Sequence, residues 1–363
     1  MKVNKFSCRD FRNIKDCEIF PHSGTNVIYG QNAQGKTNLI EGIWLFCGAK
    51  SFRSRHDQEL VAFEKEGAYL GLEFEAFSRL QQAEIIIDGR RNATLNGVKL
   101  KGAGELCGNF CAVVFSPAHL SLIKDGPAVR RRMIDTAIGQ LYPSYVAALR
   151  GYTRAMEQRN AALRDAKYSS YVYDMLENFE ERMAHFGGEI VRHRKEYMDI
   201  IAKDISGIYS EISGNRENLS LEYDTSISST GTKEAAEELF GLLKNSRKED
   251  IISGTTSIGP HREDISFLLD GRAARSFGSQ GQQRSCVLAL KLAEAAVIKN
   301  TTGENPVILF DDVMSELDEG RQESILNRFS DMQVFVTCCE KDQIKRLQEG
   351  KTFKMDNGII KED

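Results

Sequence analysis

A glycine-rich segment near the N-terminus has the residue types and the spacing of a phosphate-binding loop. The pattern G-x4-G-K-[ST] is matched without departure by Gly30-Gln31-Asn32-Ala33-Gln34-Gly35-Lys36-Thr37. Its glycines let backbone N–H groups wrap a phosphate, and a following helix adds its positive N-terminus. Lys36 would reach the β- and γ-phosphates, and the Thr37 hydroxyl would ligate Mg²⁺. We expect an ATP site over residues 30–38, ending at Asn38; the alternative is an ordinary glycine-rich turn between a strand and a helix.

Two adjacent carboxylates, Asp311 and Asp312, directly follow the apolar run Val307–Phe310. A buried strand would deliver Asp311 to its C-terminal end, where the carboxylate would ligate Mg²⁺ together with Thr37. Asp312, one peptide further, is placed to orient or deprotonate an attacking water. By itself the pair could be a strand ending in a polar turn. Together with the loop it predicts an ATP–Mg²⁺ site in which Lys36, Asp311 and Asp312 are catalytic.

The distance along the chain between these two motifs is informative. Lys36 and Asp311 are 275 residues apart, too far for a small kinase or GTPase core. A large insertion must therefore separate the two halves of one nucleotide site. The helical segment that begins near residue 120 is the candidate.

The elements before the insertion read as strands around one helix. A helix beginning at Thr37 has an apolar face at helical spacing. Polar and apolar residues alternate over Tyr69–Phe77, which predicts a half-buried strand. Turn dipeptides at Asp88-Gly89 and Asn96-Gly97 make residues 69–100 an antiparallel meander. Further short strands are expected at Val3–Phe11, Cys17–Phe20, Val27–Tyr29 and Ala112–Phe115.

The middle of the chain reads as helical. Asp125-Gly126-Pro127 begins a helix with proline in its first turn. Residues 142–213 carry charge on every turn, which predicts a solvated helical hairpin or bundle. Two short helices follow, at 233–243 and 247–252, before strands return at 264–269 and 306–310. The expected domains are an N-terminal half of the head (1–122), an inserted helical lobe (123–253) and a C-terminal half of the head (254–363).

Composition limits the class of protein. The chain has 363 residues with 41% hydrophobic and 28% charged residues, which is typical of a globular protein. It has no run of 18 apolar residues and no apolar leader, so we expect neither a membrane segment nor a signal peptide. Eight scattered cysteines point to reduced thiols in a cytosol, and Cys107 with Cys111 is too few ligands for zinc. The net charge of −4 argues against a uniformly basic DNA-binding protein, although a local basic strip would suffice.

Further segments match a family. Ser279-Gln280-Gly281-Gln282-Gln283-Arg284 looks like an ABC signature, with Gln280 where glycine is commoner, and Ser315-Glu316-Leu317-Asp318 looks like an ABC D-loop. With Phe11-Arg12-Asn13 ahead of the phosphate loop, the chain resembles the SMC-like DNA-repair ATPases and, within them, the RecF family. The same resemblance extends to Ser51-Phe52-Arg53, Phe115-Ser116-Pro117, Gly126-Pro127, Arg130-Arg131-Arg132 and Gly259-Pro260-His261-Arg262.

The resemblance implies an α/β fold: an ABC-type P-loop ATPase head with an antiparallel β subdomain and an inserted, mainly helical second lobe. Its signature residues would stand at the start of a helix over 283–298 and cap the γ-phosphate of ATP held by an opposing subunit. ATP would then clamp a homodimer, with the D-loop residues Ser315 and Asp318 at the same interface. The signature residues concerned are Ser279, Gln280, Gly281 and Gln282; as residues alone they fit a polar helix N-cap equally well.

Two departures from the ABC pattern predict slow hydrolysis. Thr337 stands where ABC transport ATPases usually carry a histidine, and its hydrogen bond to a γ-phosphate would be weaker. No glutamine occupies Phe115-Ser116-Pro117, where a Q-loop would place one. The resemblance therefore implies a weak, DNA-dependent ATPase that acts mainly as a switch.

The basic residues that would contact DNA are less well defined. Arg53 and Arg55 resemble the arginine that senses nucleotide or DNA in SMC-type heads. Arg130, Arg131 and Arg132 are candidate DNA contacts, or else pair with Asp135 on the same helix and bridge the lobes. His261 in the Gly259–Arg262 segment is expected to be structural, because no metal cluster accompanies it.

The resemblance also implies partners and a cellular role. These are gapped duplex DNA and single-/double-strand junctions, with RecR and RecO as partners in loading recombinase during recombinational repair, replication restart and the SOS response. A cytoplasmic, nucleoid-associated protein without membrane contact is expected. Two main alternatives remain: a structural DNA clamp of SMC type and a non-repair ABC ATPase. The short insertion argues against the SMC-type clamp. A P-loop kinase is a distant third alternative.

Overall fold

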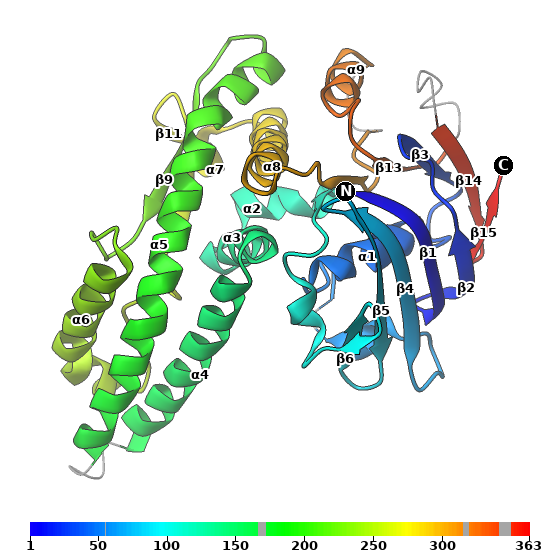
Figure 1. Ribbon diagram of the computed structural model, residues 1–363. Helices are drawn as coiled ribbons and strands as arrows, with labels where there is room; N and C mark the ends of the chain where they lie inside the picture. The colour runs from blue at the N-terminus through cyan, green and yellow to red at the C-terminus, as the bar shows by residue number, and fades with distance from the viewer. Residues whose placement is uncertain (55, 166–171, 315–318, 341–349) are drawn as a thin grey trace. The chain divides into compact units, whose positions relative to one another are not determined.

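The computed structural model describes the chain except for residues 55, 166–171, 315–318 and 341–349, and except for the side chains of 172–174, 319 and 321. The chain forms two compact units (Figure 1). Unit 1 comprises Met1–Leu120 and Leu290–Asp363, and unit 2 comprises Ser121–Ala289. A single segment thus interrupts unit 1, as the wide separation of the two nucleotide motifs predicts.

Unit 1 contains a six-stranded antiparallel sheet in the order β2-β1-β4-β5-β6-β7. The alternation over residues 69–77 is confirmed, since Leu70, Leu72 and Phe74 of β4 are buried. The antiparallel pairings β4–β5–β6–β7 also confirm the meander. The strands are β1 (Lys2–Phe11), β2 (Ile14–Ile19), β4 (Ala68–Ala76), β5 (Arg79–Ile87), β6 (Arg91–Leu95) and β7 (Val98–Lys99).

The second sheet of unit 1 carries the nucleotide motifs. Its order is β15-β14-β3-β13-β12-β8, and every pairing is parallel except that of β14 with β15. All four residues of β12 are buried, as expected for a strand covered on both faces. The strands are β3 (Thr25–Tyr29), β8 (Ala112–Phe115), β12 (Val307–Phe310), β13 (Val334–Cys338), β14 (Gly350–Asp356) and β15 (Ile359–Glu362).

Helix α1 (Lys36–Trp44) connects the two sheets of unit 1. It contacts β1 of one sheet and β13 of the other. Its apolar residues Leu39, Ile40 and Ile43 are fully buried, which anchors the phosphate loop at its N-terminus. The remaining helical elements of unit 1 are η1 (Leu45–Cys47), η2 (Asp57–Leu60), η3 (Ala103–Leu106), η4 (Pro117–Leu120) and α9 (Glu319–Arg328).

Unit 2 is mainly helical. Helix α5 lies between α4 and α6, which confirms the expected bundle (Figure 1). A three-stranded antiparallel sheet, β11-β10-β9, completes the unit. Its elements are α2 (Ser121–Lys124), α3 (Pro127–Leu141), α4 (Pro143–Asp165), α5 (Val172–Ser213), β9 (Leu219–Asp224), α6 (Thr232–Ser253), β10 (Asp264–Leu269), β11 (Arg272–Ala273) and α7 (Ala274–Phe277). Helix α8 (Gln280–Thr302) begins in unit 2 and continues into unit 1 from Leu290.

Three expectations about the elements need correction. Residues 232–253 form one helix rather than two, because the buried Arg159 of α4 bonds the Leu243 carbonyl and Asp250 on either side of the expected break. The signature helix begins at Gln280, one turn earlier than expected. Segment 254–289 groups with unit 2 rather than with the head, because β10 pairs along its length with β9.

Unit 2 is held together by arginines that are themselves buried. Arg159 is 0% exposed and bonds both Glu180 and Asp250, which joins α4, α5 and α6. Arg194 of α5 bonds Asp135 and Glu263 in the same way. Within the described residues, no helix is long and apolar enough to cross a membrane.

Candidate functional site

The predicted phosphate loop connects β3 to α1 and has the backbone of such a loop. Gly30, Ala33 and Gly35 all have positive φ, of 153°, 65° and 117°. A side chain at position 30 would place its Cβ 2.2 Å from the Met355 carbonyl oxygen, so glycine is required there. Gly35 is the N-cap of α1, so the first N–H groups of this helix are available to an anion.

Lys36 lies inside the loop. Its ammonium group donates hydrogen bonds to the Gly30 and Gln31 carbonyls, at 2.6 and 3.0 Å, and the residue is only 4% exposed. The loop thus holds a buried cation on two of its own carbonyls, and contact of Lys36 with phosphate oxygens stays a prediction.

The two motifs that are 275 residues apart in sequence meet at the ends of parallel strands. Thr37 donates a 2.7 Å hydrogen bond to the Asp311 carboxylate. Thr337, at the end of β13, lies 3.2 Å from the same carboxylate oxygen and accepts a 2.9 Å hydrogen bond from the Asp312 N–H. Thr337 therefore orders the two acidic residues, and its contact with a γ-phosphate stays a prediction.

The Asp311 carboxyl has a raised pKa. Burial is the largest cause, and the neighbouring Asp312 carboxylate raises the pKa further. Hydrogen bonds from Thr37 and Thr337, and the charge of Arg53, act in the opposite direction. A cation placed at this carboxylate would favour its ionised form.

The residues present fit Mg²⁺. One carboxylate oxygen and one hydroxyl oxygen, 2.7 Å apart, are the hard oxygen ligands that Mg²⁺ accepts when phosphates supply the others. Across the described residues no group of three or more His, Cys, Asp or Glu side chains could hold a metal by itself. The donor set thus suits a metal that arrives with a nucleotide.

Asn13 in the β1–β2 turn supports the phosphate loop, a role that the sequence did not reveal. Its amide donates to the Ala33 carbonyl at 3.1 Å, and its carbonyl accepts from Asn38 at 2.7 Å. A Cβ at Gly35 would lie only 2.8 Å from the Asn13 oxygen. The one sequence signal for this contact was the Phe11-Arg12-Asn13 segment that contributes to the resemblance.

The β14–β15 hairpin supports the loop from a second direction. The Gly358 N–H donates to the Gln34 carbonyl at 2.9 Å, and the Asn357 N–H donates to the Gln34 side chain. A Cβ at Gly358 would lie 2.1 Å from the Asn13 carbonyl, so this hairpin also touches the β1–β2 turn. No motif in the sequence indicated this support.

Arg53 belongs to the site, and Arg12 reinforces its surroundings. Arg53 donates to the Asn38 side chain at 2.8 Å and lowers the pKa of Asp311 by its charge. Arg12 makes a bidentate pair, at 2.9 and 3.0 Å, with Glu41, which is fully buried in α1. Arg55 lies outside the described residues, as do the D-loop residues Ser315 and Asp318.

The signature residues form the start of α8. The Ser279 N–H donates to the Gln282 side chain at 2.6 Å, and the Gln282 N–H donates to the Ser279 hydroxyl at 3.3 Å. This reciprocal pair is a capping box, so the polar N-cap is confirmed. Ser279, Gln280 and Gly281 are exposed on unit 2, whereas the phosphate loop belongs to unit 1. Contact of Ser279 with a phosphate stays a prediction.

The three arginines of α3 are not equivalent. Arg130 is 5% exposed and bonds Asp264 and two backbone carbonyls, so burial removes it from the candidate DNA contacts. Arg131 donates to the Glu263 carbonyl, and Arg132 is exposed. The expected pairing with Asp135 is not observed, because that carboxylate bonds Tyr145 and Arg194 instead.

His261 is structural, as expected. Its ring bonds the Tyr152 hydroxyl at 2.8 Å and the Thr256 carbonyl at 3.0 Å. Burial lowers its pKa to about 4, so the ring is neutral at physiological pH.

Comparison with known proteins agrees with this geometry. A family model described as RecF/RecN/SMC N terminal domain matches residues 2–361. A solved structure of an SMC head bound to the C-winged helix domain of ScpA has a TM-score of 0.56 at 15% identity, covering 100% of this chain and 97% of its own, which supports the fold alone. The fold and the site together define an ABC-type ATPase head of the SMC class.

Closer relatives define the family. The DNA replication and repair protein RecF of Clostridium acetobutylicum is 37% identical, with 100% of both chains covered. That of Acetivibrio thermocellus is 36% identical, with 97% of this chain and 100% of its own covered. The structure described as "recombination mediator protein RecF-ATP in RecFOR pathway" matches with a TM-score of 0.92 at 35% identity, covering 100% of this chain and 97% of its own. The chain belongs to the RecF family.

Proposed function

We propose that this protein is an ATP-dependent DNA-binding protein of recombinational repair and replication restart. The observation that carries the proposal is the 2.7 Å hydrogen bond between Thr37 and Asp311, next to a Lys36 ammonium held inside the phosphate loop. These three side chains supply a cation and two hard oxygens at one point, which is what an ATP–Mg²⁺ complex requires.

Four residues would have distinct roles in nucleotide binding and hydrolysis. Lys36 would exchange its two carbonyl partners for β- and γ-phosphate oxygens, and Thr37 and Asp311 would hold Mg²⁺. When bound, Mg²⁺ supplies Lewis-acid polarisation of the phosphoryl oxygens. Asp312, whose N–H is fixed by Thr337, would orient or deprotonate the attacking water.

Dimerisation would couple ATP to DNA. The exposed first turn of α8, beginning at Ser279, offers N–H groups and a positive helix end to the γ-phosphate of ATP on a second subunit. Two of the solved relatives are described as RecF with ATP or ATPrS in the RecFOR pathway, which supports ATP as the nucleotide.

Slow hydrolysis would reset the switch. Thr337 is committed to the acidic pair and offers a γ-phosphate at most a weak hydrogen bond. We infer a weak, DNA-dependent ATPase that binds duplex DNA beside single-stranded gaps and works with RecR and RecO in the cytoplasm, on the nucleoid. A turnover of hundreds per second, with or without DNA, would contradict this hypothesis.

Sedimentation velocity tests the shared-site mechanism. Wild-type protein is compared with Lys36→Met and Ser279→Arg variants, each with and without ATP–Mg²⁺ and a gapped duplex. We expect the wild type to dimerise with ATP and both variants to stay monomeric. Lys36→Met should also lose ATP binding, whereas Ser279→Arg should keep it, because its lesion lies in the other unit.

The same experiment has a clear contrary outcome. If both variants still dimerise with ATP, the shared site does not exist. If the wild type binds neither ATP nor DNA, the proposed function itself is wrong. Folding of each variant is checked by its thermal unfolding without ATP. Ser279→Arg removes the capping hydroxyl of α8 and should cost about 1 kcal/mol, whereas Lys36→Met removes two hydrogen bonds to loop carbonyls and should still fold.

A further inference from the structure

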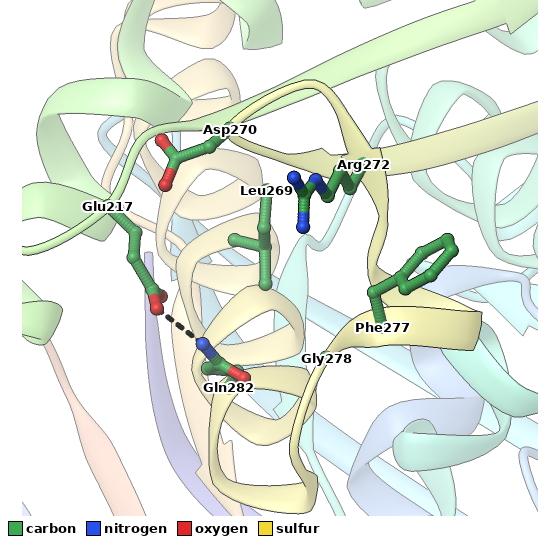
Figure 2. Close-up of a pocket in the computed structure, with 7 residues that line it drawn as sticks. All are labelled: Glu217, Leu269, Asp270, Arg272, Phe277, Gly278 and Gln282. Atoms are coloured by element: carbon green, nitrogen blue, oxygen red, sulfur yellow. Dashed lines mark hydrogen bonds between the residues drawn. The ribbon is translucent and has the colours of Figure 1, made fainter.

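A cavity of about 360 Å³ opens beside the signature residues in unit 2 (Figure 2). This volume falls within the range of small-molecule sites, roughly 300–1,000 Å³. Its lining comes from the β10–β11 hairpin, the loop before β9, the end of α7 and the start of α8. The residues are Glu217, Leu269, Asp270, Arg272, Phe277, Gly278 and Gln282.

The walls of the cavity combine three kinds of chemistry. Leu269 is 8% exposed and gives an apolar floor, while the Phe277 ring is 72% exposed, which is unusual for a large aromatic side chain. Arg272 is exposed, and nothing in the described part of the chain pairs with its guanidinium group. In Figure 2 the Arg272 and Phe277 side chains lie on one side of Leu269, with Asp270 and Glu217 on the other.

Asp270 has accepting capacity left over. One of its oxygens accepts from the Asn218 N–H at 3.0 Å, and no described donor reaches the other. Glu217, by contrast, is occupied: it accepts from the Gln282 amide and from the Tyr209 hydroxyl. Asp270 is therefore the acceptor that the cavity offers to a ligand.

The cavity and the signature share residues and hydrogen bonds within unit 2. Gln282 lines the cavity and also makes the capping box with Ser279. The buried Gln283 amide donates to the Ala274 and Gly278 carbonyls, each at 3.1 Å, which joins α7 to α8. A Cβ at Gly278 would lie 2.7 Å from the Ala274 oxygen, so only glycine permits this approach. A ligand in the cavity would thus lie directly beside the signature.

We infer that this cavity binds the nucleoside part of the nucleoside triphosphate whose γ-phosphate reaches Ser279. The inference rests on the proposed function, in which that nucleotide is held by the phosphate loop of a second copy of this chain. The exposed Phe277 ring stacks on the base, and Arg272 adds a cation beside it. The open oxygen of Asp270 accepts a hydrogen bond from a ribose hydroxyl, as carboxylates do in nucleotide sites.

Two probes, ATP and inorganic tripolyphosphate, separate nucleoside binding from phosphate binding. The dimerisation midpoint of the full chain is measured by sedimentation with each probe and Mg²⁺, for wild type and for Phe277→Ala. We expect the variant to need about tenfold more ATP, the loss of one stacked base, while its response to tripolyphosphate is unchanged. Asp270→Asn should reduce the preference for ATP over 2′-deoxy-ATP, because the carboxylate that accepts from the ribose hydroxyl is lost. The variant should keep the turn, since asparagine tolerates the positive φ of 46° at this position.

Controls separate this inference from a general loss of dimers. Phe63→Ala removes an even more exposed aromatic side chain, 91% exposed, from unit 1 and should leave both dimerisation midpoints unchanged. At protein concentrations too low for dimers, Phe277→Ala should bind ATP with wild-type affinity, because the cavity acts on the nucleotide of another subunit.

Three outcomes overturn the inference. If Phe277→Ala dimerises with the same ATP and tripolyphosphate midpoints as the wild type, the cavity does not bind the nucleotide. Equal weakening with ATP and with tripolyphosphate assigns Phe277 to a contact between protein surfaces instead. A wild type that binds ATP as a monomer and never dimerises overturns both this inference and the shared site on which it rests.

Discussion

Asp311 is buried at the end of β12 and must carry a negative charge to bind a cation. It is 4% exposed, and burial raises its pKa above the ordinary value of 3.8. A carboxyl whose pKa is raised on folding favours the folded state at low pH, and this contribution is lost as the pH rises through the raised pKa. At a pH above the raised pKa, where Asp311 is ionised, its buried charge therefore lowers the stability of the folded state.

Asp311→Asn should raise stability while abolishing function. We expect the free energy of unfolding at pH 7 to increase by about 0.5–2 kcal/mol, since a buried charge is removed. The gain should shrink as the pH falls through the raised pKa of Asp311 toward the ordinary value of 3.8, because the wild-type carboxyl becomes protonated over that range. Thermal unfolding across this pH range, without nucleotide, measures the effect. Asp16→Asn, an exposed position in β2, is the control and should show no such trend; a variant less stable than the wild type at pH 7 contradicts the expectation.

At the same scale, the residues that do chemistry were predictable and those that support them were not. Lys36, Thr37 and Asp311 belong to short patterns whose types follow from phosphate and metal chemistry. Asn13 acts through one amide that meets Ala33 and Asn38 only after folding. A long-range hydrogen bond to the phosphate loop leaves no local sequence pattern, because a polar side chain from any neighbouring element could make it.

Among the elements, the β14–β15 hairpin depends on a glycine turn that presses against the β1–β2 turn. Gly358 has φ of 75° and no room for a Cβ, while Gly89 has φ of 78° with open space around it. Gly358→Ala should lose about 3 kcal/mol or more, and Gly89→Ala about 1 kcal/mol, which is the backbone cost alone. The difference between them isolates the clash with Asn13.

The same pair of variants reports on the nucleotide site. Because the Gly358 N–H also bonds Gln34 of the phosphate loop, Gly358→Ala should weaken ATP affinity, and Gly89→Ala should not. Chemical denaturation gives the stabilities, and calorimetric titration gives the affinities. Equal effects of both substitutions would mean that the hairpin does not support the loop.

How well an element was predicted depended on where its stabilising contacts come from. Strand β12 and helix α1 have apolar patterns set by burial on both faces, so they were visible in the sequence. Strand β14 buries only Phe353 and Met355, and its pairing with β3 is made with residues more than 300 positions away. The break expected in α6 is absent because the buried Arg159 of α4 bonds the Leu243 carbonyl and Asp250 on either side of it, a tertiary contact that helix propensity does not contain.

On the scale of the whole molecule, the net charge of −4 gives the proposed DNA binding no help from overall electrostatic attraction. A chain with 48 basic and 52 acidic residues has no long-range attraction for a polyanion, so contact must come from local basic groups. Arg130 is removed from that set by burial, whereas Arg132 on the same helix is exposed. A single contact of this kind per subunit would be weak, whereas the two subunits of the proposed ATP-clamped dimer would bind DNA as a pair.

We therefore expect gapped duplex DNA to bind at least about tenfold more tightly with ATP than without it at physiological salt. Fluorescence anisotropy over a range of salt concentrations checks this, and the slope of log affinity against log salt counts the phosphates contacted. Arg132→Glu should lower affinity and reduce that slope, whereas Lys248→Glu, an equal charge change at an exposed position of α6, should act only through net charge and more weakly. Tight DNA binding without nucleotide would show that the basic surface of the monomer is sufficient. The ATP-bound dimer would then not be required for DNA binding.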